Sequence, residues 1–309
     1  MGPSHTKLRA ARASVRAGVG WRLGSVRRMG TLVSFHAHPD DESIGTGGTI
    51  AKAADAGHRV VLVFATRGEL GEPVPGVLAE GEQLTLRRTA EVYRSADVLG
   101  VHRVEFLGFT DSGMMGEDTN DAPWCFWQAD VEHAARRLAT ILSEEQPDVL
   151  TIYDDNGGYG HPDHIQVHRV GRRAAELVGV PVVAQGTMNR DLIARAMAMA
   201  KEAGIDVPDP TEVPEEPPEG MTAAEGATAA VVFGKAEAEL THVVDTAEVT
   251  ERKRASMLSH ASQIGPDHFM ATMPPDIFEF VFGPEWYLVE EVPADPPALF
   301  TDLFSPKPE

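Results

Sequence analysis

The sequence predicts an α/β fold in which helices cover both faces of a mostly parallel sheet, followed by an irregular C-terminal subdomain. Two observations favour this fold. From residue 31 to residue 178, short runs of apolar and β-branched residues alternate with longer segments of helical composition. The apolar runs are nearly continuous, as expected for strands that are buried on both faces. Strands separated by helices of this length form βαβ units, whose crossovers are right-handed.

Each strand and helix of this half has its own signal. Apolar runs predict strands at residues 31–37, 59–65 and 148–153, and a third strand along the chain is expected at residues 102–107. Helical composition predicts helices at residues 47–56, 83–99, 126–145 and 164–178. The first three helices are followed by Gly57, Gly100 and Pro147, respectively. Glycine and proline at such positions are typical stop signals of helices.

The C-terminal part carries weaker signals. Helices are expected at residues 190–203 and 246–263, and strands at residues 229–233 and 286–292. Residues 208–220 are rich in proline and glutamate and predict an exposed loop. The proline-rich tail from residue 293 is expected to extend over the surface. We therefore divide the chain into an α/β core at residues 29–185 and a C-terminal part at residues 186–309 that completes the fold.

The first 28 residues differ in charge from the rest. They contain seven Lys or Arg and no Asp or Glu, whereas the whole chain has a formal net charge of −20. They lack the uninterrupted apolar stretch of a secretory signal. We interpret residues 1–28 as a basic disordered tail or an over-extended start, and we expect the domain to begin near Met29.

The net charge and the single cysteine narrow the range of expected partners and cellular compartments. So acidic a chain is expected to repel nucleic acid and anionic membrane surfaces, and no apolar run approaches the roughly 18 residues that span a bilayer. Cys125 is the one cysteine and lies among apolar residues, which favours a packed thiol. A chain without a disulfide framework fits a reducing cytoplasm. The sequence thus predicts a cytoplasmic protein with a small-molecule partner, and it leaves a homo-oligomer open.

Two polar clusters follow predicted strands at the point where each strand ends. The first is His38-Pro-Asp-Asp-Glu42, after the strand at 31–37, and the second is Tyr159-Gly-His-Pro-Asp-His164, after the strand at 148–153. Ligands of open parallel sheets bind outside the carboxyl ends of the strands. We therefore expect both clusters to face one crevice.

The residue types in these clusters suit a catalytic metal. Catalytic zinc takes three nitrogen or oxygen ligands and keeps one position for water. We predict His38, Asp41 and His164 as these ligands, with Zn²⁺ as the metal; Fe²⁺ accepts the same ligand set and remains an alternative. His168, one turn after His164, is expected to have a structural role rather than a fourth ligand role.

Further residues of the clusters fit acid–base chemistry. Asp40 is placed to accept a proton from a metal-activated water, and His161 to stabilise the oxyanion of a tetrahedral intermediate. Asp163 is expected to hold the tautomer of that imidazole or to keep it protonated. The alternatives are that Asp40 caps a helix and that His161 is a capping or core residue.

Two residues after other strands are candidates for substrate binding. Arg67 follows the strand at 59–65, and Asp111 follows the strand at 102–107. Arg67 is predicted to clamp a substrate oxygen and Asp111 to bind sugar hydroxyls. A structural ion pair and a simple turn are the respective alternatives. The run Gly45-Thr-Gly-Gly48 does not match a nucleotide-binding pattern, and we expect its small residues to let a helix start close to the metal.

Four motifs together resemble the LmbE-like or PIG-L family of zinc N-deacetylases. They are Ala37-His-Pro-Asp-Asp-Glu42, Thr66-Arg-Gly-Glu69, Asp111-Ser-Gly-Met114 and Gly160-His-Pro-Asp-His164, and Ser259-His-Ala-Ser-Gln263 is a weaker match near the C-terminus. The resemblance implies a Rossmann-like sheet, the metal ligands and base named above, and an oxyanion role for His161 with Tyr159 assisting at the carbonyl. Residues 190–226 have no counterpart in the resemblance, and we expect them to cover or border the substrate pocket.

The resemblance implies a hydrolase that removes the N-acetyl group from a small molecule containing N-acetylglucosamine. A mycothiol S-conjugate amidase is the nearest alternative, because it cleaves the same kind of bond beside the same sugar. A non-haem iron oxygenase would use a similar ligand set, but such sites usually lie on all-β barrels. A non-catalytic sugar-binding relative would lack Asp40 or a metal ligand, and a metal phosphoesterase would need more Lys and Arg beside the motifs.

Overall fold

One sheet organises the part of the chain that the computed structural model describes, residues 29–202, 233–290, 292 and 299–305. The strand order is β3-β2-β1-β4-β5-β7-β6. The expectations for residues 1–28 and 208–220, and most of those for 229–233 and the C-terminal tail, lie outside these residues. The predicted α/β fold with a mostly parallel sheet is confirmed.

Five neighbouring strands of the sheet are parallel: β1 (Thr31–His36), β2 (Arg59–Phe64), β3 (Arg103–Phe106), β4 (Val149–Tyr153) and β5 (Val182–Thr187). The C-terminal part adds β7 (Pro284–Val289), antiparallel to β5, and β6 (His242–Asp245), antiparallel to β7. The chain moves from β1 outward through β2 to β3, and then returns to place β4 on the other side of β1. The strand order therefore reverses between β1 and β4, which is where open α/β sheets bind their ligands.

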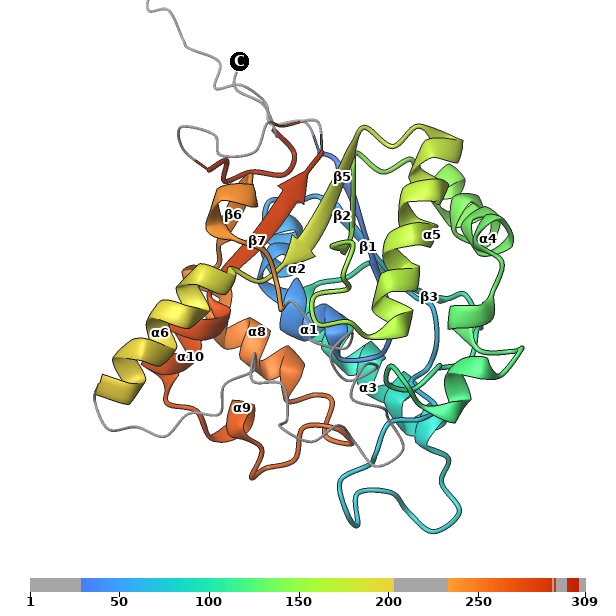
Figure 1. Ribbon diagram of the computed structural model, residues 1–309, viewed down its shortest axis with the longest axis horizontal. Helices are drawn as coiled ribbons and strands as arrows, with labels where there is room; N and C mark the ends of the chain where they lie inside the picture. The colour runs from blue at the N-terminus through green and yellow to red at the C-terminus, as the bar shows by residue number, and fades with distance from the viewer. Residues whose placement is uncertain (1–28, 203–232, 291, 293–298, 306–309) are drawn as a thin grey trace, which may run out of the picture.

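Helices lie on both sides of the sheet (Figure 1). On one side α4 (Val131–Glu145) packs beside α5 (Pro162–Val178), and on the other lie α2 (Gly47–Asp55) and α3 (Leu84–Leu99), with α8 (Thr250–Met257) packed against both. The remaining helices are α1 (Asp41–Gly45), α6 (Arg190–Glu202), α9 (Phe269–Thr272) and α10 (Pro275–Phe282). Four short 3₁₀ turns complete the described elements: Asp118–Asp121, Phe126–Gln128, Glu237–Glu239 and Ala247–Val249.

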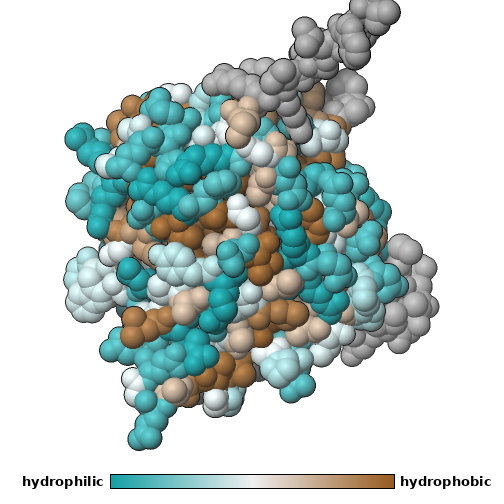
Figure 2. All heavy atoms as spheres, turned by 180° about the vertical axis from the view of Figure 1, so that it is seen from behind, coloured by the Kyte–Doolittle hydropathy of each residue, from teal (hydrophilic) through white to brown (hydrophobic). Residues whose placement is uncertain are grey.

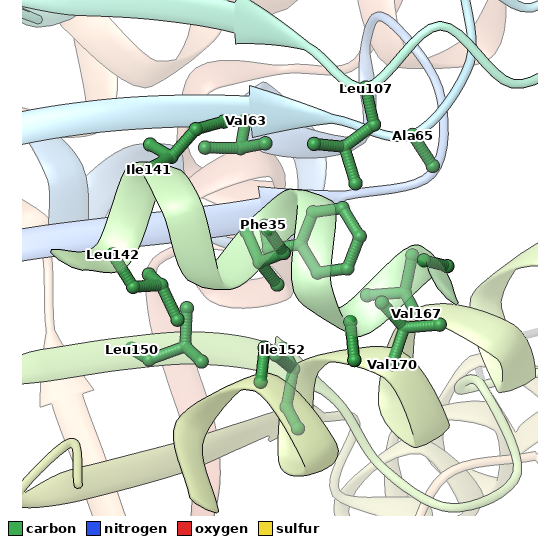
Figure 3. Close-up of a cluster of buried hydrophobic side chains, with 14 of the residues drawn as sticks. Phe35, Val63, Ala65, Leu107, Ile141, Leu142, Leu150, Ile152, Val167 and Val170 are labelled. Carbon is green, nitrogen blue, oxygen red and sulfur yellow. The ribbon is translucent and has the colours of Figure 1, made fainter. Parts of the chain in front are cut away.

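The hydrophobic core has one layer on each face of the sheet. Because side chains of a strand alternate between faces, Val33 and Phe35 of β1 belong to one layer and Leu32 to the other. In the first layer, Ile141 and Leu142 of α4 and Val167 and Val170 of α5 close over β1, β2 and β4 (Figure 3). These layers fix the strands, and therefore the loops at their carboxyl ends.

Several element boundaries differ from the sequence prediction for local reasons. The helix expected at 126–145 begins only at Val131, because the Asp130 side chain caps it by accepting a hydrogen bond from the His133 backbone N–H at 2.8 Å. The helix expected at 164–178 begins at Pro162, since proline is tolerated in the first turn. The helix expected at 246–263 is a 3₁₀ turn, then α8, then a non-helical segment.

Other elements were not expected at all. β5, β6, α1, α9 and α10 have no counterpart in the prediction, and β7 covers Pro284–Val289 rather than 286–292. Part of the tail also packs inward: Leu303 is buried, and the Phe304 ring stacks on His58 with centroids 3.7 Å apart. These features depend on partners distant in sequence, so local patterns carry little of their signal.

The glycine-rich run after the first cluster has a different role from the one expected. A Cβ on Gly48 would lie 2.4 Å from Thr246, so the close approach is to the C-terminal part. The Gly48 and Thr49 backbone N–H groups donate to Glu285 at 2.8 and 2.7 Å at the start of α2. The positive end of the helix dipole also stabilises a carboxylate at this position.

The surface is mixed in character. Seen from behind, hydrophobic residues are interspersed with hydrophilic ones (Figure 2). Cys125 is buried, as expected of a packed thiol. Among the described residues, no helix is both long and apolar enough to cross a membrane.

Candidate active site

The two polar clusters meet beside the reversal of strand order. The first follows β1 and continues into α1, and the second precedes and begins α5 after β4. The backbone of Asp40 has φ +110°, which is rare for a residue other than glycine. Such a conformation costs about 1–3 kcal/mol and persists only where its surroundings hold it. This places a strained residue between His38 and Asp41.

Three donor atoms converge in this region. Asp41 Oδ2 lies 3.4 Å from His38 Nδ1 and 3.4 Å from His164 Nε2. Ligand atoms of a tetrahedral zinc ion, bound at roughly 2.0–2.2 Å, are about 3.4 Å apart. His164 Nε2 is buried without a hydrogen-bond partner, and a metal ion would satisfy it. The nitrogen and oxygen atoms around Asp41 therefore fit a divalent metal ion.

Hydrogen bonds on the far side of each ring fix the tautomers needed for metal binding. His164 Nδ1 donates to the Gly157 carbonyl at 3.2 Å, and its ring stacks on Tyr153 with centroids 4.2 Å apart. His38 Nε2 donates to Asp163 Oδ2 at 3.1 Å. These contacts leave His38 Nδ1 and His164 Nε2 facing Asp41, and a second hydrogen bond on the far nitrogen is typical of metal-ligating histidines.

Asp163 therefore occupies a different position from the one expected. Its carboxylate contacts His38 rather than His161, and it also accepts hydrogen bonds from the backbone N–H and the hydroxyl of Ser112. Asp163 and His161 are two residues apart at the start of α5, and side chains at that spacing do not face each other. The hydrogen bond between the Asp163 carboxylate and His38 Nε2 orients the His38 ring.

We predict that Asp163→Asn weakens metal binding about 10–100-fold, the usual range for a partner of a metal ligand. The amide can present its nitrogen to His38 and lose the acceptor that fixes the tautomer. Competition with a chelator of known affinity would measure the change. Unaltered metal affinity in this variant would show that Asp163 does not orient His38.

His161 lies beside the three proposed ligand atoms, but its ring makes different hydrogen bonds from the other two histidines. Its Nδ1 accepts a hydrogen bond from the Asp163 backbone N–H at 3.1 Å. Burial, together with His38 and His164, lowers the pKa of His161 to about 2, which keeps the ring neutral. A neutral ring that accepts at Nδ1 carries its proton on Nε2. His38, His161 and His164 are close enough to share a metal. The proton on His161 Nε2, however, makes that nitrogen a hydrogen-bond donor rather than a metal ligand.

Asp40 is held by a buried arginine. Its Oδ2 accepts a hydrogen bond from Arg88 Nη2 at 3.1 Å, and Arg88 also donates to the carbonyls of Pro39 and Gly68. Burial raises the pKa of Asp40 to about 6, although the positive charge of Arg88 opposes the shift. A carboxyl group with a pKa near neutrality is suited to act as a general base.

Asp111 lies closer to the cluster than expected of a residue that binds only hydroxyls. Its Oδ1 is 3.5 Å from His38 Nε2, and its carboxylate accepts from the backbone N–H groups of Gly113 at 2.9 Å and Leu70 at 3.3 Å. His38 and these contacts lower the pKa of Asp111 despite its burial. Asp41, Asp111 and Asp163 thus surround His38, and this concentration of carboxylates favours a cation.

The other two candidates, Tyr159 and Arg67, have different neighbours. The Tyr159 ring lies edge-on to His164, with centroids 5.0 Å apart, and burial together with the Asp41 charge raises the Tyr159 pKa. The Arg67 guanidinium lies over the Phe106 ring, 4.8 Å from its centroid, at the edge of the sheet. Tyr159 therefore belongs to the cluster, whereas Arg67 lies with Phe106. His168 Nδ1 donates a hydrogen bond to the Tyr153 carbonyl at 3.0 Å, a structural contact.

Sequence reasoning missed several residues of this region. Tyr153, Ser112, Arg88 and Glu42 are buried or half-buried around the cluster, and none of them was assigned a role from the sequence. Glu42 and Ser112 belong to named motifs, whereas Tyr153 and Arg88 do not. The position of Tyr153 at the end of a strand beside both motifs was the available signal.

Comparison with known proteins agrees with this geometry. The family described as PIG-L: GlcNAc-PI de-N-acetylase matches residues 33–175. A 1D-myo-inositol 2-acetamido-2-deoxy-alpha-D-glucopyranoside deacetylase from Thermobifida fusca is 38% identical, over 89% of this chain and 98% of its own. This chain belongs to the PIG-L family. The resemblance inferred from the four motifs is confirmed.

Other comparisons extend the PIG-L match. A relative of the same name from Nocardiopsis dassonvillei is 39% identical, over 87% of this chain and 98% of its own. The structure of N,N'-diacetylchitobiose deacetylase from Pyrococcus horikoshii has the same fold, with a TM-score of 0.54 and 22% identity over 84% of this chain and 83% of that chain. The PIG-L match contains both polar clusters but ends before the Ser259–Gln263 motif.

Proposed function

We propose that this PIG-L protein is a zinc-dependent deacetylase of 1D-myo-inositol 2-acetamido-2-deoxy-α-D-glucopyranoside, releasing acetate and the free amine. The observation that carries the proposal is the convergence of His38 Nδ1 and His164 Nε2 on Asp41 Oδ2, at 3.4 Å each, beside Asp40. The substrate is proposed from the relatives named above, which carry this activity in their names over nearly their whole length.

His38, Asp41 and His164 would hold the metal. When bound, zinc lowers the pKa of water to about 7 and polarises a carbonyl oxygen. Zinc is proposed over Fe²⁺ because nitrogen and carboxylate ligands suit it and because the four motifs resemble those of zinc N-deacetylases. Removing the metal with a chelator should therefore abolish turnover.

Asp40 takes the proton of the water that attacks the acetyl carbonyl carbon. It then delivers that proton to the amine nitrogen as the carbon–nitrogen bond breaks, so that acetic acid and a neutral amine leave. The acetic acid then loses its proton to the solvent and becomes acetate. His161 donates from Nε2 to the carbonyl oxygen as negative charge develops there, and the Tyr159 hydroxyl assists at the same oxygen. Donors already in position need little reorganisation during the reaction.

Substrate orientation is assigned to the loops after β2 and β3. We propose that Arg67 and Asp111 bind hydroxyls of the sugar or of inositol, because a guanidinium and a carboxylate suit a polyol. Asp111 is 3.5 Å from His38 and lies next to the reacting bond, whereas Arg67, over Phe106, would contact a more distant part of the substrate. The core at residues 29–185 carries these groups, and residues 186–309 are proposed to border the pocket.

Acetate release from the N-acetylglucosaminyl-inositol compound tests the proposal. The metal-loaded protein should release one acetate for each amine formed. The same glucosaminyl-inositol carrying a cysteinyl acyl group is the comparison substrate. Turnover confined to the cysteinyl compound would overturn the deacetylase assignment while leaving metal-dependent amide hydrolysis in place.

A further inference from the structure

The Ser259–Gln263 motif lies outside both metal-site clusters, but one of its residues reaches the first cluster. His260 is fully buried after α8, and its Nε2 lies 2.6 Å from Glu42 Oε1. Glu42 is also fully buried. An imidazole and a carboxylate buried together form a strong, short contact that removal of either partner would leave uncompensated.

Glu42 links this contact to Asp40. Its Oε1 accepts from His260 and from the Ser95 hydroxyl at 2.5 Å, and its Oε2 accepts from the backbone N–H of Asp40 at 2.9 Å. The hydrogen bonds therefore run from the C-terminal part, through one carboxylate, to the backbone of the proposed base. Ser95 is in turn 2.7 Å from Ser256 of α8, so that α3 and α8 support the same carboxylate.

The backbone of Asp40 needs such support. Its φ of +110° is unfavourable for an aspartate, and a strained residue keeps its conformation only when neighbours hold it. Arg88 holds the carboxylate of Asp40, and Glu42 holds the backbone N–H. If Glu42 lost a donor and moved, the peptide between Pro39 and Asp40 could turn and carry the carboxylate away from the attacking water.

We infer that His260 is a positioning residue for the deacetylation, which holds Asp40 in its catalytic conformation through Glu42. The inference rests on the proposed function, because it assigns His260 a part in the action of Asp40. It assigns a role to the C-terminal motif that lies 218 residues from Glu42 in the sequence. His260 contacts Glu42, so its effect is on orientation rather than on the reacting atoms.

A purely structural role predicts something different, and the same motif provides the control. Ser262 docks on α3 through two hydrogen bonds to buried Glu91, from its backbone N–H at 2.9 Å and its hydroxyl at 2.5 Å. Ser262→Ala removes the hydroxyl contact and leaves Glu42 and His260 in place. It therefore loosens the Ser259–Gln263 segment but keeps the hydrogen bonds from His260 through Glu42 to Asp40.

The test compares His260→Leu, His260→Gln and Ser262→Ala in the zinc-loaded full chain, with the N-acetylglucosaminyl-inositol compound as substrate. His260→Leu should lower kcat about 10–100-fold, the range typical of residues that support a catalytic site, with KM and zinc content unchanged. His260→Gln retains an N–H donor and should recover part of that loss. Ser262→Ala should keep the kcat of the wild type.

Three results would overturn the inference: an unchanged kcat in His260→Leu, equal losses in the Leu and Gln variants, or an equal loss in Ser262→Ala. If His260→Leu does not fold, Ser95→Ala provides the test, since it removes the other side-chain donor to Glu42 and leaves His260 in place. A lower kcat with unchanged zinc content supports the inference, and an unchanged kcat overturns it. Wild-type protein that releases no acetate would instead refute the proposed function.

Discussion

Replacing His164 by alanine should leave a folded protein that neither retains zinc nor turns over substrate. The imidazole supplies one of three proposed ligand atoms, and its buried Nε2 has no other partner. Loss of a ligand should cost more than the 10–100-fold typical of the residues that support ligands. Zinc content after desalting and the rate of acetate release would measure the two effects, and thermal unfolding would confirm that the sheet is intact.

His168→Ala is the matched control for this variant. His168 is also a buried histidine of α5, one turn later, but it contacts the Tyr153 carbonyl rather than the donor atoms. We expect this variant to keep its zinc and its activity. If His164→Ala retained full zinc occupancy, or if both variants lost zinc equally, the ligand assignment would be wrong.

Replacing Asp40 by asparagine should separate catalysis from metal binding. Asparagine tolerates positive φ and can still accept a hydrogen bond from Arg88, but its amide cannot take a proton from water. We expect full zinc occupancy and a fall in kcat of about 10²–10⁴-fold, the usual contribution of a general base. Steady-state kinetics at fixed zinc would measure the fall.

Asp155→Asn controls for the loss of one negative charge. Asp155 follows β4 and forms an ion pair with Lys235 at 2.5 Å. It therefore carries a negative charge but does not belong to the cluster of proposed metal ligands. We expect its kcat to stay close to that of the wild type. Normal turnover by Asp40→Asn would refute the assignment of Asp40 as the base.

The parallel part of the fold could be predicted because each strand is a nearly continuous apolar run between helical segments. β5 was missed even so: it directly follows α5 and contains Gln185 and Gly186, which weaken the apolar pattern. β7 pairs with β5 and with β6, and these strands are separated by long stretches of chain. Such pairing depends on tertiary contacts, which local periodicity does not record.

The candidate site was predictable where residue types and strand ends coincide. His38, Asp41 and His164 were proposed from two motifs, and the structure brings their donor atoms together. Asp163 was expected to hold the tautomer of His161, and it contacts that ring through its backbone N–H, while its carboxylate contacts His38. The direction of a side chain at a helix start depends on the loop that packs against it. Here that loop contains Ser112, which binds the carboxylate from the other side.

The contacts that Arg88 and His260 make with the first cluster could not be predicted from sequence patterns. Arg88 lies on α3 and His260 follows α8, and neither carries a spacing that points to the clusters. Both approach the first cluster only because α3, α8 and α1 pack together. Their roles follow from buried hydrogen bonds, which appear when the fold is known.

The most direct test of the account is a crystal structure of the zinc-loaded protein with anomalous diffraction measured on both sides of the zinc absorption edge. We predict one peak bonded to His38 Nδ1, Asp41 and His164 Nε2, at the roughly 2.0–2.2 Å usual for zinc, with Asp40 and His161 facing its open side. Two other groups of the described residues could compete for the ion. A peak bonded to His38, His161 and His164 without Asp41, or to His38, Asp111 and Asp163, would contradict the account.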